Sequence, residues 1–400
     1  MTLAVTVLYV LSQYVFATTH TTTIHPRLMP YWESQMEQDR DYPQFAPDPA
    51  TMIERTPLGT FTLKTLLHSG VYSAVFTVNE TRTILIKYQC DCDDPADLHP
   101  ILRDGWISTM ANEWDICPKT HYISPPVALP VPRVGKFGLK MSQSSRERCA
   151  AQGGTVRYMV MERVLGESLS VRKFRLENIP FLMSHSVAIV IHVLAKLRTL
   201  HDNGIVHGDV HTGNVLISSD ADGYMLVHLI DFGLAFFDEP NLPNHPVFEE
   251  GTWLHELTSP WQLQGYPWSK RDDVYRAVDM LARLINGQEY MSFVRELKNT
   301  GHGALLTWRM TEFLFEIPPG TIHTGPFPFD PTRLGVDDDT AMEIRRRFRT
   351  IWEFALDVDN VNDEPAIIEI QTELMKILTA VFPQTKSSPT PQPPQPIDGS

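Results

Sequence analysis

The segment that decides the fold reads His207-Gly-Asp-Val-His-Thr-Gly-Asn-Val-Leu-Ile217, and the triplet Asp231-Phe-Gly233 follows it after a short polar and then apolar stretch. The segment contains Asp209 and, five residues later, Asn214. A carboxylate, an amide and a second carboxylate in this order supply a proton acceptor and two oxygen ligands for divalent ions, as phosphoryl transfer requires. Each piece alone is a weak signal, but the three together at this spacing are a strong one. We therefore expect Asp209 to act as the catalytic base, and Asn214 and Asp231 to bind the metal ions.

A site of this kind also needs a cation for the nucleotide phosphates and a cover over them, and both are expected upstream. Residues 83–88 form an apolar, β-branched run with one lysine, Lys87, which is typical of a buried strand with a single inward charge. Residues 67–75 have the outline of a glycine-rich hairpin, with Gly70 and Val75 in place. Two further glycines that would let the backbone approach the phosphates closely are missing. We expect Lys87 to bind phosphate, and the hairpin to cover ATP less tightly or with a different shape.

Taken together, these stretches resemble the eukaryotic-like protein kinase superfamily over about residues 58–383. The resemblance implies an α+β, bilobal fold. A small β-rich lobe would occupy about residues 57–162 and a larger helical lobe about residues 167–383. It also implies ATP as the phosphate donor, Mg²⁺ (or Mn²⁺) as the metal ion, and a protein as the substrate.

The run Tyr158-Met-Val-Met-Glu-Arg-Val164 with Leu-Gly-Glu167 resembles the fifth strand and hinge of protein kinases. On that resemblance Met161 lies beside the adenine, Glu162 and Val164 offer backbone groups to the base, and Glu167 reaches the ribose. On its own the run would be a buried strand with methionine filling a gap. The upstream lysine and the downstream aspartate favour the hinge.

Two stretches after the Asp-Phe-Gly triplet fit the same family. Residues 251–260, from Gly-Thr to Ser-Pro, resemble the segment that receives a protein substrate, and residues 269–281 have apolar residues at helical spacing. In the family an aspartate of this helix, here Asp273, bonds the backbone of the catalytic loop. Small-molecule kinases of the aminoglycoside and choline type usually lack such a segment. We therefore expect a protein substrate, with Ser or Thr as acceptor rather than Tyr.

Three departures from the family pattern affect the expected chemistry. Gly208 replaces the arginine that reads a phosphate on the activation segment, so activity should not require phosphorylation there. His211 stands where Ser/Thr kinases usually place a lysine against the γ-phosphate, and it would donate to that phosphate more effectively when charged. Ser259-Pro-Trp261 replaces Ala-Pro-Glu, so the usual glutamate–arginine ion pair cannot form, as in enzymes of the casein kinase type.

The acidic partner of Lys87 has two candidates, Asp104 and Glu113. The casein kinase pattern places this acid fourteen residues before a proline, and counting back from Pro118 gives Asp104. Aspartate is one methylene shorter than glutamate, so its helix would have to lie closer to the lysine. Glu113 has the usual chemistry but lies only five residues before the proline. We favour Asp104 and keep Glu113 as the alternative.

The two ends of the chain differ from its middle in composition. Residues 1–17 are apolar, too short to span a bilayer comfortably, and end in Val-Phe-Ala, which predicts a secretory signal peptide. A retained anchor or a buried strand are the alternatives. Residues 18–56 form a polar N-terminal extension, and residues 384–400 form a Pro-rich tail that we expect to be disordered. The triplet Asn79-Glu-Thr81 is a glycosylation acceptor, so we expect the protein to be secreted or lumenal.

The cysteines and the overall charge indicate which disulfides, metal sites and partners the sequence allows. Cys90, Cys92, Cys117 and Cys149 allow two disulfides in an oxidising compartment, although free thiols remain possible and the spacing is no zinc signature. The formal net charge of −14 argues against nucleic acid as a partner. We expect no transmembrane segment beyond the leader, and the oligomeric state is not predicted.

The sequence patterns predict strands in the first part of the chain and helices after them. The patterns predict strands over about 60–90 and 119–164, with a helix over 97–113 between them, and a largely buried helix over 185–201. His201 is expected to cap that helix, and His207 to pack under the Asp-Phe-Gly turn. The basic run Arg345–Arg349 is expected to lie on a solvated helix face.

Three classes of function fit the sequence. The leading one is a Ser/Thr protein kinase, and retention of its base, lysine and metal ligands supports activity. The second is a kinase-fold phosphotransferase for a small molecule or sugar, which Gly208 and His211 favour. The third is a pseudokinase that binds nucleotide without turnover, which the thin hairpin favours.

Overall fold

The computed structural model describes residues 53–56, 58–69, 73–78, 84–90, 100–125, 127–128, 155–169, 179–238, 268–299, 336–356 and 367–381, with Arg27, Pro30, Ser34, Ser259 and Gln262. The chain divides into two compact units. The first comprises residues 1–171, 202–209 and 213–240, and the second comprises residues 172–201, 210–212 and 241–400. Strands gather in the first unit and long helices in the second, which confirms the expected α+β class.

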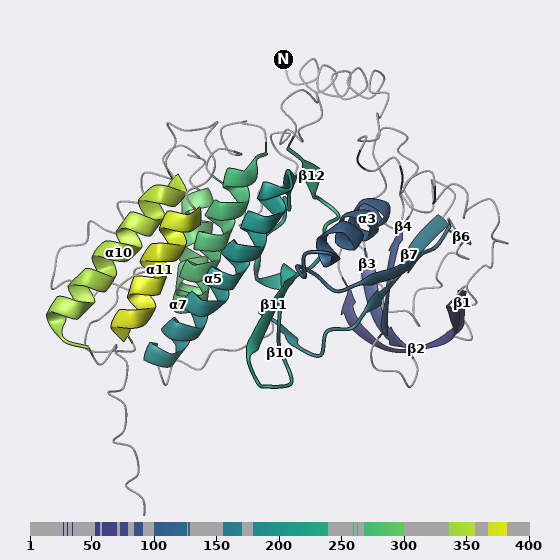
Figure 1. Cartoon of the computed structure of the whole chain (residues 1–400), viewed down its shortest axis with the longest axis horizontal. Helices are drawn as coiled ribbons and strands as arrows, with labels where there is room; N and C mark the ends of the chain where they lie inside the picture. The colour runs from purple at the N-terminus through teal and green to yellow at the C-terminus, as the bar shows by residue number, and fades with distance from the viewer. Residues whose placement is uncertain are drawn as a thin grey trace, which may run out of the picture. The chain divides into compact units, whose positions relative to one another are not determined.

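The first unit is built on an antiparallel sheet (Figure 1). Its strands follow the spatial order β1-β2-β3-β4-β7-β5, and β6 also pairs with β7. Their bounds are β1 (Ile53–Thr56), β2 (Gly59–Ser69), β3 (Ser73–Val78), β4 (Ile84–Cys90), β5 (Thr120–Ile123), β6 (Val127–Ala128) and β7 (Thr155–Glu162). The strands expected over residues 60–90 and 119–164 are therefore present.

The longest regular pairing in this sheet joins β4 and β7. It runs from Ile84 opposite Glu162 to Cys90 opposite Val156, and it places Lys87 opposite Met159. Both strands are rich in β-branched, aromatic and methionine side chains, which suit a pleated and buried surface. Residues 157–160 of β7 are all buried, so this strand lies in the interior of the sheet.

Helix α3 (Pro100–Asn112) lies against this sheet beside β5 and β7 (Figure 1). Proline occupies its first position, where the missing N–H would be unpaired in any case. Most described side chains of the helix are buried, including those of Asp104 and Ser108. A helix buried over most of its surface has no clean apolar stripe, which explains why its sequence pattern is weak.

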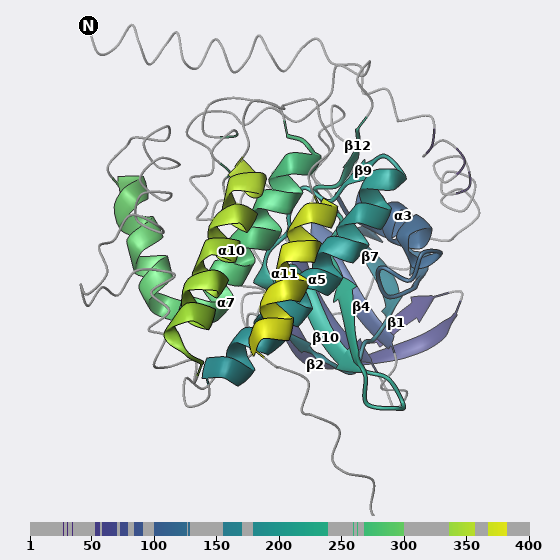
Figure 2. The ribbon, with the colours of Figure 1, turned by 60° about the vertical axis from the view of Figure 1, so that its left-hand side comes forward.

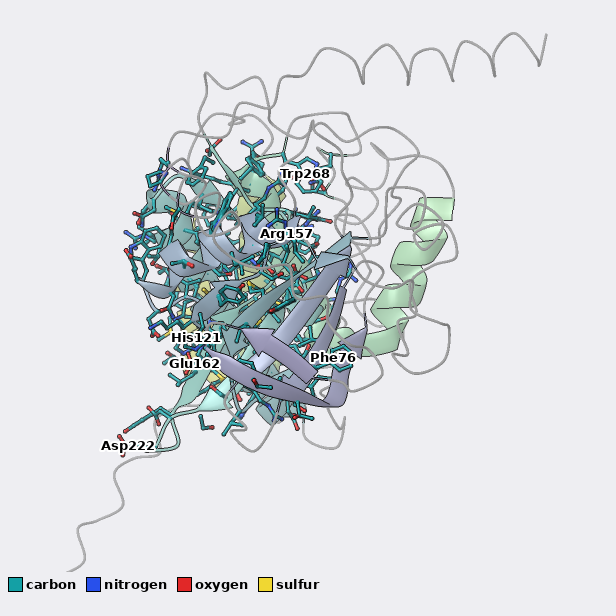
Figure 3. All side chains as sticks on the ribbon, turned by 90° about the vertical axis from the view of Figure 1, so that its right-hand side faces the viewer. Phe76, His121, Arg157, Glu162, Asp222 and Trp268 are labelled. Atoms are coloured by element: carbon teal, nitrogen blue, oxygen red, sulfur yellow. The ribbon has the colours of Figure 1, made fainter. Side chains whose placement is uncertain are left out.

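Short strands follow the sheet and carry the candidate site. β10 (Val215–Ser219) pairs with β11 (Met225–Leu229) and with β8 (Glu167–Ser168), and β9 (Ile205–Val206) pairs with β12 (Phe236–Phe237). Asp222 marks the exposed tip of the β10–β11 hairpin (Figure 3). Arg27 reaches the same unit, donates to the backbone oxygen of Asn203 at 2.5 Å, and stacks 4.6 Å from the ring centroid of Phe237.

The second unit is helical. Figure 2 shows its long helices side by side: α5 (Ile179–Asp202, whose last residue belongs to the first unit), α7 (Lys270–Asn299), α10 (Asp338–Leu356) and α11 (Ile367–Val381). Trp352 of α10 is buried and lies 5.9 Å from Tyr275 of α7, measured between ring centroids. Gln371 of α11 donates to the backbone oxygen of Ile191 in α5 at 3.0 Å. Apolar packing and this bond hold the helices together.

The basic run near residue 347 is only partly solvated, which corrects one expectation. Arg346 and Arg349 are exposed and pair with glutamates of their own helix. Arg347 is instead mostly covered and pairs with Glu373 of α11 at 2.6 Å. The reason is its position on the side of α10 that faces α11, so it joins two helices.

Within the described residues, no helix has both the length and the apolar character to cross a membrane.

Candidate active site

Asp209 and Asn214 are bonded to each other. A 3₁₀ turn, η2 (Thr212–Asn214), follows Asp209 and brings Asn214 back toward it. The amide nitrogen of Asn214 donates to the backbone oxygen and to carboxylate Oδ2 of Asp209, each at 2.9 Å. Both bonds use the nitrogen, so neither uses the amide oxygen, which is the kind of atom that Mg²⁺ prefers. Asp209 is half-buried and therefore reachable from solvent.

Asp231 lies where the chain turns sharply after β11. Its φ is 65°, in the left-handed region that non-glycine residues adopt uncommonly. The preceding residue, Ile230, donates its amide to the backbone oxygen of Asn214 at 3.0 Å. The backbone on either side of the two expected metal ligands is thus tied together. Strained residues of this kind gather at functional sites.

The ring of His207 packs under the Asp-Phe-Gly turn, as expected. His207 and Phe232 are fully buried, with ring centroids 4.7 Å apart. His207 Nδ1 accepts the backbone N–H of Asp209 at 3.3 Å. The histidine therefore links the turn to the backbone of the expected base and has a structural role.

Asp104 is the acid that reaches the Asp-Phe-Gly turn. Its Oδ1 accepts the backbone N–H of Phe232 at 2.8 Å and the hydroxyl of Ser108 at 3.2 Å, in a buried position. The neighbouring Arg103 donates to the backbone oxygen of Gly233 at 3.3 Å. Glu113, the alternative, lies in the turn after α3 and is exposed. Of the two candidates, Asp104 is therefore the one bonded to the Asp-Phe-Gly turn, and its pairing with Lys87 stays a prediction.

Lys87 lies in the middle of the sheet, between two residues of neighbouring strands. Its backbone is opposite Val75 in β3 and Met159 in β7. Val75 is half-buried. The lysine expected to bind phosphate and the valine expected to cover the nucleotide are thus direct neighbours in the sheet. Gly70 falls outside the described residues.

The expected hinge begins at the end of β7. The amide of Glu162 donates to the backbone oxygen of Lys119 at 2.8 Å, and Glu162 lies at the same end of the sheet as His121 (Figure 3). Met161 and Val164 are half-buried. Glu167 is exposed in β8, opposite Ile217 of β10. The sheet therefore leads directly into the strand pair that follows the catalytic loop.

Gly208 and His211, the two departures from the family pattern near Asp209, differ in burial and backbone conformation. Gly208 is buried and has a φ of 75°, which favours glycine over any other residue. His211 is half-buried and belongs to the short segment of the second unit at residues 210–212.

A buried polar cluster in the second unit joins Ser259 and Gln262 to the start of α7. Asp272 accepts hydrogen bonds from the hydroxyl of Ser259 and from the backbone N–H of Ser269, the latter at 2.7 Å. Gln262 accepts from the backbone N–H of Ser259 at 2.9 Å and from Arg276 at 3.3 Å. Burial raises the pKa of the Asp272 carboxyl above its ordinary value, against the bonds and the positive charge of Arg276, which lower it.

Sequence reasoning missed this cluster because its members lie up to seventeen positions apart. One local signal existed. Ser269 and Asp272 have the spacing of a capping box at the start of α7, which marks the helix end but not the buried partners. Residues 251–258 and 260 fall outside the described residues, so of the expected substrate segment the structure describes Ser259 alone.

His201 does not cap the helix end, contrary to expectation. Its Nε2 lies 3.0 Å from Oδ2 of Asp273, and both residues are buried. The partner of His201 therefore comes from α7, 72 residues away. Helical spacing alone could not reveal a contact between two helices. The pair holds the end of α5 against the start of α7.

Cys117 forms no disulfide in the structure, which differs from the expectation for this residue. Its Sγ is buried and donates to the backbone oxygen of Ser108 at 3.1 Å. The side chains of Cys90, Cys92 and Cys149 fall outside the described residues. In the described ranges, no group of three His, Cys, Asp or Glu residues could hold a metal ion.

Three features together are typical of the site of a kinase-fold protein: the bonded pair Asp209–Asn214, the left-handed backbone at Asp231, and the bond from the Phe232 amide to Asp104. The chain matches the protein kinase domain family over residues 146–312.

Three relatives illustrate the similarity. A probable serine/threonine-protein kinase of Corynebacterium efficiens is 34% identical over 138 residues, covering 34% of this chain and 20% of that protein. The KEOPS complex subunit Bud32 of Pyrococcus abyssi is 30% identical over 152 residues, covering 38% of this chain and 62% of Bud32. Human serine/threonine-protein kinase VRK2 is 32% identical over 131 residues, covering 31% of this chain and 24% of VRK2. The matched stretches thus span less than two thirds of each relative.

The chain is therefore similar to the eukaryotic-like protein kinase superfamily over this central region, as a divergent relative.

Proposed function

We propose that this protein is a serine/threonine protein kinase that transfers the γ-phosphate of ATP to hydroxyl groups of protein substrates. The observation that carries the proposal is the pair formed by Asp209 and Asn214, with Asp231 fixed beside it through the backbone. A kinase site requires these three side chains together, and relatives named as serine/threonine-protein kinases support the acceptor type.

The roles of the side chains follow from their chemistry. The substrate hydroxyl oxygen attacks the γ-phosphorus, Asp209 accepts the hydroxyl proton, and the bond from the γ-phosphorus to the bridging oxygen breaks so that ADP leaves. The bond from Asn214 holds the Asp209 carboxylate in one orientation. Asn214 and Asp231 supply oxygen ligands of the type that Mg²⁺ or Mn²⁺ binds. Lys87 neutralises phosphate charge. Bound divalent ions would offset the charge that builds up on the phosphate oxygens during transfer.

The remaining residues position the nucleotide. Met161, Glu162, Val164 and Glu167 continue from β7 toward β10, and we assign them to the adenine and ribose. Val75 covers the nucleotide from β3. His211 is assigned to the γ-phosphate, where a charged imidazole would donate a hydrogen bond. None of these roles requires the protein to form a covalent bond, so positioning and charge neutralisation carry the rate.

The test is phosphate transfer by the chain from Thr18 onward. The protein is incubated with Mg²⁺ or Mn²⁺ and γ-labelled ATP, and offered casein, a basic protein, and a panel of sugars and amino alcohols. Label on Ser or Thr of a protein, lost in Asp209→Ala, supports the proposal. Ser219→Ala, an exposed residue on the β10–β11 hairpin, serves as the matched control and should transfer normally.

Two other outcomes would replace the proposal. Label found only on a small molecule would indicate a kinase-fold phosphotransferase of another substrate class. No transfer, with ATP still raising the melting temperature, would indicate a pseudokinase.

We also propose that the protein acts in the secretory pathway or outside the cell. The support is the composition of residues 1–17 and the acceptor triplet at Asn79. In a eukaryotic host, the full chain should acquire a glycan that a glycosidase removes, while Asn79→Gln and a chain lacking residues 1–17 should not. An unglycosylated full chain retained in the cytosol would contradict this assignment.

A further inference from the structure

Gly105 lies in the middle of α3, where an added side chain would force its neighbours to shift. A Cβ atom added there would meet Cδ1 of Ile123, and would lie 2.9 Å from Cγ1 of Ile123 and 3.2 Å from Sδ of Met159. Ile123 in β5 and Met159 in β7 are both buried, so their side chains would have to move within the packed core. Glycine weakens a helix interior relative to alanine. Its presence here lets α3 lie closer to β5 and β7 than another residue would allow.

Asp104, the residue before Gly105, makes a contact that depends on how closely α3 lies to the sheet. Asp104 bonds the Phe232 amide at 2.8 Å, so its carboxylate reaches the Asp-Phe-Gly turn directly. A glutamate would carry its carboxylate one methylene farther from the helix backbone. For the Asp104 carboxylate to reach the Phe232 amide, α3 must lie closer to the Asp-Phe-Gly turn than a glutamate would require. The position of the helix sets this distance.

One of the atoms that limit α3, Sδ of Met159, belongs to β7, the strand beside that of Lys87, and the other two belong to Ile123 in β5. Met159 is the residue directly opposite Lys87 in the β4–β7 pairing. The contact between Gly105 and Met159 therefore fixes the helix at the level of the lysine along the sheet. Arg103, with its bond to the oxygen of Gly233, holds the same turn of α3 from its other side.

We propose that Gly105 is the positioning residue for Asp104, and that the two act as one unit in place of a single glutamate. The absence of a side chain at Gly105 brings α3 toward the sheet, and this brings the Asp104 carboxylate to the Phe232 amide. The inference rests on the proposed kinase function where it concerns transfer. The bond between Asp104 and Phe232 can be followed without any activity.

The experiment is a double-mutant cycle of Gly105→Ala, Asp104→Glu and the two combined. Amide-resolved hydrogen exchange measures protection of the Phe232 N–H, and steady-state kinetics measures kcat and KM for ATP. Each single change should speed exchange of this amide and lower kcat/KM, each by about tenfold or more. The combined variant should return to within about threefold of the unchanged protein, because the longer acid again reaches the turn from a helix that lies farther out.

A second variant covers the case in which Gly105→Ala fails to fold. Ile123→Val removes Cδ1, the atom that the added Cβ meets first. Gly105→Ala combined with Ile123→Val should therefore fold and regain part of the Phe232 protection. Ile123→Val alone gives the baseline for the lost methyl group and should transfer phosphate normally.

The direction of the stability change separates spacing from helix propensity. Alanine is the better helix former, so Gly105→Ala would raise the melting temperature if spacing were irrelevant. We expect it to lower the melting temperature. A raised melting temperature with Phe232 still protected would overturn the inference, and so would a combined variant whose losses simply add.

The proposed function and this inference can fail separately. If the unchanged protein transfers no phosphate, the proposed function is wrong, and the exchange rates of the Phe232 amide in the cycle still decide the inference. If transfer is normal but Phe232 exchange is the same in all variants, only the inference is wrong.

Discussion

The amide nitrogen of Asn214 donates to two atoms of Asp209, the proposed base, and we propose that the amide oxygen of the same residue binds a metal ion. The spacing of the two residues along the chain was enough to expect both roles. What the spacing could not supply is the direct bond between them, because that bond depends on the 3₁₀ turn at Thr212–Asn214. If Asn214 has both roles, substitutions there should affect the transfer rate and the Mg²⁺-dependent binding of ATP separately.

Asn214→Asp keeps an oxygen ligand but removes the donor to Asp209. We expect kcat to fall by about 100-fold or more, because the carboxylate of Asp209 loses its fixed orientation and faces a like charge. Mg²⁺-dependent ATP binding, measured by calorimetry, should persist in Asn214→Asp and weaken in Asn214→Ala. Equal loss of binding in both variants would contradict the dual role.

The buried carboxyl of Asp272 makes a pH prediction. Burial raises its pKa in the folded chain, so the folded state binds this proton more tightly than the unfolded state. Its contribution to stability is therefore fully present below the ordinary aspartate pKa of about 4, and is lost as the pH rises through the raised value.

Asp272→Asn removes this dependence. The free energy of unfolding of the variant minus that of the unchanged protein should increase as the pH rises from about 4, and then level off. Urea unfolding of both proteins across a pH series measures the difference. A difference that is constant with pH, or that decreases, would show that the carboxyl is not held with a raised pKa.

At the scale of elements, sequence patterns located most strands and helices but not the contacts between them. Apolar runs predicted the strands around Lys87, and helical spacing predicted α5 over residues 185–201, where the structure begins the helix at Ile179. The pair of His201 with Asp273 and the cluster around Asp272 join distant segments. Local periodicity carries no information about such partners, so tertiary packing had to supply them.

The strand pair after the hinge depends on a close approach at Gly166. A Cβ atom there would meet the backbone oxygen of Ile217 and lie 2.7 Å from the carbonyl carbon of that residue. Backbone cannot rotate away as a side chain can. Gly166→Ala should therefore separate β8 from β10 and lower the free energy of unfolding by about 1–3 kcal/mol. It should also weaken ATP binding, because Glu167 is the next residue.

Gly223→Ala is the matched control for this change. Gly223 has a φ of 85° with no atom within 4 Å of an added Cβ, so alanine there meets strain but no neighbour. We expect a loss of roughly 1 kcal/mol in the unfolding free energy, since the left-handed region disfavours side chains. ATP affinity should stay unchanged. Similar ATP binding by both variants would contradict the role of the β8–β10 contact.

At the scale of the whole molecule, the fold extends beyond the region that matches the family. That region ends at residue 312, but α10 and α11 follow it and pack in the second unit. Helix α11 buries five apolar side chains: Ile367, Ile370, Leu374, Ile377 and Val381. Their burial contributes on the order of 10 kcal/mol, which is comparable to the whole stability of a typical domain.

Removing α11 should therefore unfold the second unit. A chain ending at residue 356 should lose the cooperative thermal transition followed by circular dichroism and should be cut rapidly by protease. A chain ending at residue 383 loses only the Pro-rich tail and should melt like the full protein. An unchanged transition in the shorter chain would show that α11 is dispensable.

Gly208 has a consequence for how this kinase-fold protein could change its regulation. Its φ of 75° and its buried position suit glycine, and an L-residue in that region costs roughly 1–2 kcal/mol. Introducing the arginine found at this place in most kinases would thus strain the backbone next to Asp209 before any phosphate could be read. Gaining control by phosphorylation at this position would therefore carry a cost in stability, and an evolving or engineered variant would need a compensating change in the turn to offset it.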